Sequence, residues 1–236
     1  GTGNDTVTTG DGADTVTGVG GDNTISLGAG DDTLEVATFS NLSSTDTVTG
    51  GEGSDTITFQ EDAAHDFTSS STTLSGVSGF EKYKFSGLAN KTVTIDSTLV
   101  TDGAATLEFT SGVTTANNAL NASAILNSSD TITFTDNSAT GGVGTNYTLS
   151  NAKDILTLGA DTDTATVSVA AYLGTGDVLK GGSGTDTLAL AQAANSTISS
   201  AQLETASGFE VVNIVTGGAG NYKVTISDTF AANNAN

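Results

Sequence analysis

A nine-residue period near the start of the chain constrains its fold more than any other feature. Close copies of the segment Gly1–Thr8 (Gly-Thr-Gly-Asn-Asp-Thr-Val-Thr) occur at residues 10–17, 21–26, 28–35, 50–57 and 181–188. Each copy has an Asp or Asn at a fixed position and an aliphatic residue two positions later. Short repeats of this kind bury their apolar residues only against neighbouring copies, so the pattern predicts a stack of similar coils.

Each copy predicts a six-residue glycine-rich turn followed by a short strand. Glycine adopts the positive φ of tight turns, and the aliphatic residue points into the core between two sheets. The chain has 30 Gly, many Thr and no Pro, which suits stacked strands whose N–H groups all enter ladders. We therefore expect an all-β fold, a parallel β-roll or β-helix, with little helix. Ser199–Thr205 is the best candidate for a short helix.

Disorder is the main alternative to this fold, because the formal net charge is -21. Apolar residues alternate with Thr and Ser in short runs, which disordered acidic tails rarely do, so we favour the folded interpretation.

The fixed Asp position predicts metal binding. Two nonapeptides would form one coil, which places Asp5 near Asn23 and Asp14 near Asp32. At a strand spacing of about 4.8 Å, two carboxylates repel each other by a few kcal/mol. A divalent cation between the turns replaces this repulsion with ligation, and calcium prefers carboxylate and carbonyl oxygens. The alternative, that Asp simply favours turns, does not explain its constant offset.

The expected calcium ligands are the turn glycines and the acidic or amide residues at the fixed offset. They are Gly3, Asp5, Gly10, Gly12, Asp14, Gly21, Asn23, Gly28, Gly30, Asp32, Asp46, Gly51, Gly53, Asp55, Asp163, Asp177, Gly182, Gly184 and Asp186. Asn23 lacks the charge, so its site should be weaker. Asp177 should be a better ligand than Asp163. Zinc is disfavoured, because Cys is absent and His65 stands alone in a polar stretch.

A second, longer repeat organises the chain. Asn23, Asp32, Asp46 and Asp55 are separated by 9, 14 and 9 positions. The same spacings recur, at a constant 131-residue offset, in Asp154, Asp163, Asp177 and Asp186. The segment Ser-Gly-Phe-Glu recurs at nearly the same offset, at 78–81 and 207–210. We expect two tandem units, 1–131 and a degenerate, truncated 132–236.

The second unit should hold fewer calcium sites. Asp136 aligns with Asp5, but Thr145 replaces Asp14. Glu81 and Glu210 either close a turn or ligate calcium, and the sequence favours the structural role.

The copies fit the pattern Gly-Gly-x-Gly-x-Asp-x-aliphatic-x, so the chain resembles the RTX (repeat-in-toxin) family of calcium-binding β-roll proteins. The resemblance is strong over residues 1–59 and 173–191. It implies type I secretion from a Gram-negative bacterium and folding outside the cell at millimolar calcium. The Thr-, Ala- and Gly-rich composition and the Gly-Phe-Glu segments are most similar to bacterial surface-layer (S-layer) proteins.

We therefore expect a calcium-stabilised structural segment of an extracellular lattice protein, and not an enzyme. It should associate with itself into a lattice or filament, with cell-surface polysaccharide as a further candidate partner. The alternatives are a repeat array of a large RTX adhesin and the calcium-binding C-terminal region of a type I-secreted hydrolase.

Several other functions are disfavoured by the residues themselves. With one His and no Cys, a Ser-His-Asp triad could be completed only through His65, and the His-Glu-x-x-His zinc motif does not occur. The calcium pattern already explains most carboxylate pairs that a glycosidase would use. All six basic residues are Lys, so we expect no nucleic-acid binding. No run approaches the roughly 18 apolar residues of a membrane span, so we expect no membrane insertion.

Overall fold

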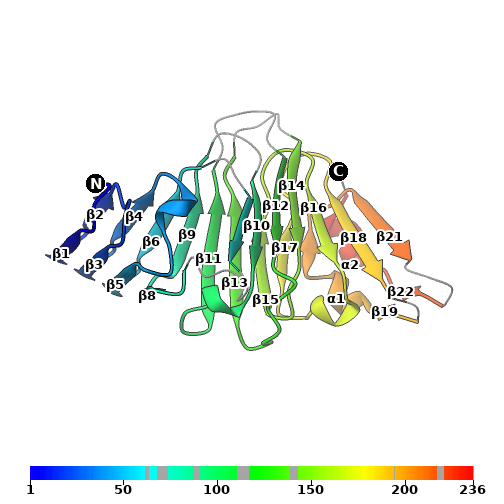
Figure 1. The fold of residues 1–236 in the computed structure, drawn as a ribbon. Coiled ribbons are helices and arrows are strands. Elements are labelled where there is room, and N and C mark those ends of the chain that lie inside the picture. Colours follow the sequence, from blue (N-terminus) through cyan, green and yellow to red (C-terminus); the bar gives the residue numbers. More distant parts are fainter. Residues whose placement is uncertain are drawn as a thin grey trace.

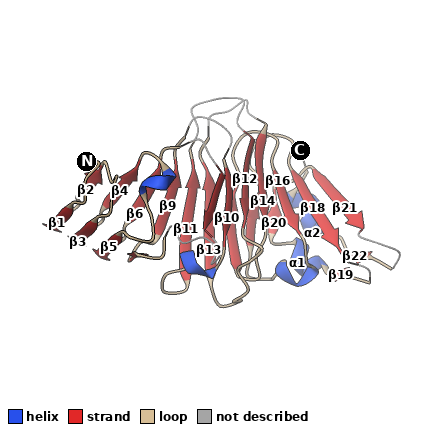
Figure 2. Ribbon diagram, in the orientation of Figure 1, coloured by secondary structure: helices blue, strands red, loops and turns tan. Residues whose placement is uncertain are grey.

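The chain winds into a parallel β-solenoid of about seven turns, whose strands lie side by side along one long axis (Figure 1). The computed structural model describes residues 1–61, 64–67, 74–87, 91–110, 117–138, 143–193, 195–216 and 221–235. All strand pairs within the sheets are parallel, and helices are few and short (Figure 2). The predicted all-β, coiled fold is confirmed.

The strands form three main sheets and one minor sheet, and the strands of each sheet follow one another in space in the order named. Sheet A consists of β1 (Thr6–Asp11), β3 (Thr24–Ala29), β5 (Thr47–Glu52) and β8 (Val77–Ser78). Sheet B consists of β2 (Thr15–Thr17), β4 (Thr33–Val36), β6 (Thr56–Phe59), β9 (Lys82–Phe85), β11 (Ala104–Phe109), β13 (Thr131–Asp136), β15 (Lys153–Thr157), β17 (Val178–Lys180) and β20 (Ala206–Ser207). Sheet C consists of β21 (Val211–Thr216), β18 (Thr187–Gln192), β16 (Thr164–Val167), β14 (Gly144–Thr148), β12 (Asn117–Asn121), β10 (Thr92–Ile95) and β7 (Ala64–Phe67). β19 (Thr197–Ile198) pairs with β22 (Lys223–Val224) in sheet D.

Sheet B extends from the first coil to the last, and the chain alternates between it and sheet A or sheet C. In the first coil Val7 pairs with Ile25, the equivalent residue two nonapeptides further along the chain, which confirms that two nonapeptides form one coil. Ile25 then pairs with Val48. These two residues are 23 positions apart in the sequence (48 − 25), whereas two nonapeptides span 18. The longer coil accommodates the 3₁₀ helix η1 (Phe39–Asn41), so the strict nonapeptide spacing holds only locally.

The core is a stack of inward-facing side chains, which alternate with outward-facing ones along strands such as β4, β11 and β13. Its most regular part is an aromatic ladder of Phe59, Phe85, Phe109, Phe134 and Tyr147, all at most 1 % exposed. Ring centroids of successive members are 5.0–5.5 Å apart. Such pairs contribute about 0.5–1.5 kcal/mol each beyond the burial of their area. The ladder therefore fixes the register of the coils in the middle of the molecule.

The regular helices are α1 (Ser200–Leu203) and α2 (Asp228–Asn233), with further 3₁₀ helices η2 (Ser97–Leu99) and η3 (Ala170–Tyr172). Ser199 caps α1 through a capping box with Gln202, which confirms the short helix predicted there. α2 buries Phe230 beside β20.

No helix among the described residues is long or apolar enough to span a membrane.

Equivalent elements recur at the 131-residue offset. The 3₁₀ helices η1 and η3, the strands β4 and β16, and the strands β6 and β18 are all related in this way. However, β4 and β6 belong to sheet B, whereas β16 and β18 belong to sheet C. Strands that are equivalent at this offset therefore lie in different sheets of the solenoid. The division into units 1–131 and 132–236 stays a prediction.

Candidate metal centre

A ladder of carboxylates runs along the turns that precede the strands of sheet B. The backbone N–H of Asp14 donates to Oδ1 of Asp32 (2.7 Å), and the N–H of Asp32 donates to Oδ1 of Asp55 (2.8 Å). The N–H of Asp55 donates to Oε2 of Glu81 (2.9 Å). We call Asp14, Asp32, Asp55 and Glu81 the first column. The carboxylates of Asp32, Asp55 and Glu81 thus each bond the backbone of the preceding coil.

A second column with the same bonding precedes the strands of sheet C. The N–H of Thr145 donates to Oδ1 of Asp163 (2.5 Å), and that of Asp163 donates to Oδ1 of Asp186 (2.9 Å). The N–H of Asp186 donates to Oε2 of Glu210 (2.8 Å). We call Thr145, Asp163, Asp186 and Glu210 the second column. Its two aspartates are related to those of the first column by the 131-residue offset, and its glutamate by the same offset with a two-residue slip.

The second oxygen, Oδ2, of four column residues is buried and has no hydrogen-bond partner. The four residues are Asp32, Asp55, Asp163 and Asp186, each at most 1 % exposed. No other buried side-chain nitrogen or oxygen in the described part of the chain lacks a partner, and neither of the ion pairs found there involves these four. A buried, ionised carboxylate is costly unless it is paired or coordinates a metal. These oxygens are therefore the strongest indication of a cation site.

The electrostatics of the columns agree with this interpretation. Burial raises the pKa of Asp163 to about 7, and the charges of Asp186 and Asp136 act in the same direction. Burial also raises the pKa of Asp186 to about 6, with a further contribution from Glu210. The pKa of Asp55 is raised as well, mainly by burial. Without a cation, these carboxyls retain protons at a pH where exposed Asp is ionised.

Asp46 and Asp177 are different, because the protein satisfies both of their carboxylate oxygens. Oδ1 of Asp46 accepts the N–H of Asn23 (2.8 Å) and Oδ2 accepts the N–H of Ser43 (2.8 Å). The carboxylate of Asp177 is held in the same way by the N–H groups of residues 154 (3.0 Å) and 174 (2.7 Å). Asp163 thus has a free oxygen and Asp177 does not, whereas the sequence favours Asp177 as the better ligand; the order of the two as calcium ligands stays a prediction.

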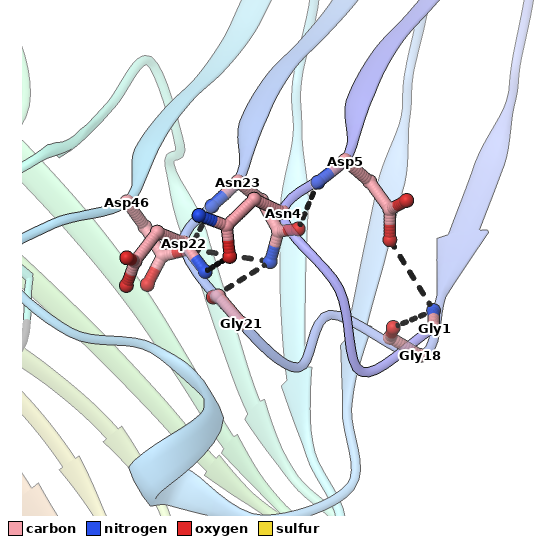
Figure 3. A network of polar contacts seen from close by, with 8 residues as sticks. All are labelled: Gly1, Asn4, Asp5, Gly18, Gly21, Asp22, Asn23 and Asp46. Carbon is pink, nitrogen blue, oxygen red and sulfur yellow. Dashed lines mark hydrogen bonds and ion pairs between the residues drawn. The ribbon is translucent and has the colours of Figure 1, made fainter.

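Figure 3 shows the stacking at the N-terminal end of sheet A, where Asp5, Asn23 and Asp46 follow one another along the axis. The N–H of Asp5 donates to Oδ1 of Asn23 (3.0 Å), and Nδ2 of Asn23 donates to Oδ1 of Asp46 (3.2 Å). The carboxylate of Asp5, half exposed, lies 3.6 Å from the N-terminal ammonium of Gly1. The predicted stacking of Asp5 on Asn23 and of Asp14 on Asp32 is confirmed.

The glycines of the repeats allow the turns to stack closely. Nine of the ten candidate glycines have positive φ: Gly10, Gly12, Gly21, Gly28, Gly30, Gly51, Gly53, Gly182 and Gly184. Gly3 does not, and it is exposed. A Cβ at Gly53 would overlap the carbonyl oxygen of Gly30 in the preceding coil. Coil stacking alone therefore requires glycine here, and it brings backbone carbonyl oxygens of successive turns together.

Buried hydrogen bonds replace the nonapeptide pattern at the start of the second half. The hydroxyl of Thr145 donates to Asp136, so the residues aligned with Asp14 and Asp5 bond each other. Tyr147 Oη donates to Oδ1 of Asp154 (2.6 Å), and burial raises the pKa of Asp154 to about 7. Sequence reasoning did not identify the Tyr147–Asp154 bond, since Asp154 was considered only as a member of the 131-residue repeat and Tyr147 was not considered.

His65 lies in β7, where its backbone pairs with Val93, and its side chain lies outside the described residues.

The donor set of the columns fits calcium. In the described part of the chain, no three or more His, Cys, Asp or Glu side chains group to hold a metal. Backbone carbonyls would therefore supply part of the ligand set of a cation beside a column. Calcium accepts such mixed oxygen ligands in flexible geometry, whereas zinc takes nitrogen and sulfur from His and Cys.

The comparison with known families agrees with this chemistry. The model of the RTX calcium-binding nonapeptide repeat matches residues 1–34, 42–59 and 174–192, in four copies. These segments contain Asp32, Asp55 and Asp186 but not Asp163. The match shows that these segments are similar to the RTX calcium-binding repeat. No curated protein and no solved structure matches the chain.

Substituting Asp55 or Asp186 by Asn should weaken calcium binding at least tenfold, measured by isothermal titration calorimetry. The amide oxygen can still accept the backbone N–H, but the charge of the free oxygen is lost. A carboxylate beside a divalent ion contributes several kcal/mol even at an effective dielectric of about 20.

The matched control is Asp46→Asn, where both carboxylate oxygens are already bonded within the protein. It should keep the calcium affinity and lower the free energy of unfolding by about 1–3 kcal/mol, because one buried N–H loses its acceptor. Equal calcium affinity in all three variants would contradict the assignment of the columns.

In chelator, the folded fraction measured by circular dichroism should be larger at pH 5 than at pH 8. The pKa values of Asp163 and Asp186, about 7 and about 6 in the folded protein, exceed the value of about 3.9 for unfolded Asp. The stabilisation from their protonation is therefore complete below pH ~3.9 and is lost as the pH rises through 6–7. Saturating calcium should remove this loss, because it binds the ionised form. A folded fraction that rises with pH in chelator would contradict the raised values.

Proposed function

We propose that the chain is a calcium-stabilised structural segment of a secreted protein, without catalytic activity of its own. The observation that carries the proposal is the set of four buried, unpartnered carboxylate oxygens beside repeats of the RTX type. At low calcium these carboxylates repel one another or retain protons, so coil stacking is weakened. Calcium that binds only the stacked coils stabilises them by mass action. Folding would then begin where calcium is abundant, outside the cell.

A calcium titration followed by far-ultraviolet circular dichroism tests this proposal. Calcium should convert a coil-like spectrum at neutral pH into a β spectrum, with a midpoint between roughly 0.1 and 1 mM, as in extracellular calcium modules. Magnesium at the same concentration should not, since it demands octahedral geometry and dehydrates reluctantly. A full β spectrum in chelator at neutral pH, unchanged by calcium, would overturn the proposal.

We further propose that the segment belongs to an S-layer or a similar extracellular lattice. The supporting observation is the Thr-, Ala- and Gly-rich composition together with the two Gly-Phe-Glu segments, at 79–81 and 208–210. Cell-surface polysaccharide is a second candidate partner.

Electron microscopy of the purified protein in calcium tests the lattice. Two-dimensional sheets or filaments should form and should disperse when chelator is added. A protein that stays monomeric in saturating calcium would count against the lattice. Glycan binding by that monomer would favour the alternative of an adhesin repeat array, and a catalytic domain in the full-length protein would favour the alternative of a secreted hydrolase.

A further inference from the structure

Glu81 and Glu210 occupy equivalent positions at the ends of the two columns. Each follows a Gly-Phe pair whose glycine has a φ of +69° and whose phenylalanine is 1 % exposed. Each accepts, through Oε2, the backbone N–H of the preceding column residue, at 2.9 Å for Asp55 and 2.8 Å for Asp186. Asp occupies this bonding position in the earlier coils. The two glutamates are therefore the terminal carboxylates of their columns.

The space beside each glutamate contains a buried oxygen without a partner. Oδ2 of Asp55 and Oδ2 of Asp186 have no hydrogen-bond partner, and both residues are 0 % exposed. In the first column, a Cβ at Gly50 would overlap the carbonyl oxygen of Gly79 and lie 2.5 Å from Oδ2 of Asp55. Carbonyl and carboxylate oxygens thus border one small space.

The second column repeats this arrangement, since a Cβ at Gly181 would overlap the carbonyl oxygen of Gly208 and lie 3.0 Å from Cβ of Asp186. The negative charge of the glutamate acts on the neighbouring aspartate in both columns. Neither of the ion pairs found in the described part of the chain supplies a compensating cation to these residues.

We infer that Glu81 and Glu210 are calcium ligands, each sharing one ion with the preceding aspartate of its column and with the glycine carbonyl beside it. The nonapeptide pattern does not predict these ligands, because both glutamates lie outside the segments that match the RTX repeat. This inference rests on the proposed calcium binding.

The experiment compares native protein with E81Q, E210Q and the double variant. The probe is calcium alone, and the readout is the number of bound ions from equilibrium dialysis, supported by calorimetry. Gln retains an oxygen that accepts the N–H of Asp55 or Asp186, so a purely hydrogen-bonding role survives the change. The matched control is E35Q, at a partly exposed position in β4 outside both columns.

Each single variant should bind one calcium ion fewer than the native protein, and the double variant two fewer, while E35Q binds the native number. Native stoichiometry and affinity in E81Q and E210Q would overturn the inference while leaving the proposed function intact. A native protein that binds no calcium would overturn both. If E81Q loses the native circular dichroism spectrum in calcium, E210Q decides the question independently in the other column.

Discussion

The buried carboxylates of the two columns hold neighbouring coils together and at the same time require a counter-charge. In Asp32, Asp55, Asp163 and Asp186, one oxygen accepts the backbone N–H of the preceding coil and the other has no protein partner. The first oxygen fixes the position of one coil on the next. The second needs a counter-charge, because stacked carboxylates at a spacing of about 4.8 Å repel one another. Coil stacking and ion binding are thus coupled in the same side chain.

This coupling is confined to the two ends of the solenoid. The first column ends at Glu81 and the second begins at Thr145. Between them, the coils are held by apolar packing, above all by Phe85, Phe109 and Phe134 of the aromatic ladder. In a solenoid each coil contacts mainly its neighbours, so stability is roughly a sum of local terms. Under the proposed calcium binding, the ion stabilises the coils that carry the columns, while the coils between them depend on their hydrophobic core.

The repeat predicted the local structure well, because both the turn and the strand are encoded within a single nonapeptide. The stacking of Asp5 on Asn23, and of Asp14 on Asp32, follows directly from the presence of two nonapeptides in each coil. The sequence did not separate Asp46 from Asp55, since both stand at the repeat position. The distinction arises because the N–H of Ser43, in the turn just before Asp46, reaches the carboxylate of Asp46.

The spacing between successive acidic residues of the repeat does separate the two kinds of aspartate. Asp46 and Asp177, whose oxygens are all satisfied, follow the previous acidic position of the repeat by 14 positions, whereas Asp55 and Asp186 follow by 9. The exchange of sheets between the two halves could not be predicted, because it depends on how many strands each coil contains. For Glu81 and Glu210 the sequence favours a structural role, because it does not show which oxygens lie beside the two carboxylates.

Anomalous-difference density from calcium, in crystals of the protein grown with calcium, tests the central claim most directly. The account predicts a peak within calcium-ligand distance, about 2.3–2.6 Å, of Oδ2 in each of Asp32, Asp55, Asp163 and Asp186. Water or a hydrogen-bonding neighbour at these four oxygens, with calcium only on exposed acidic residues, would contradict it.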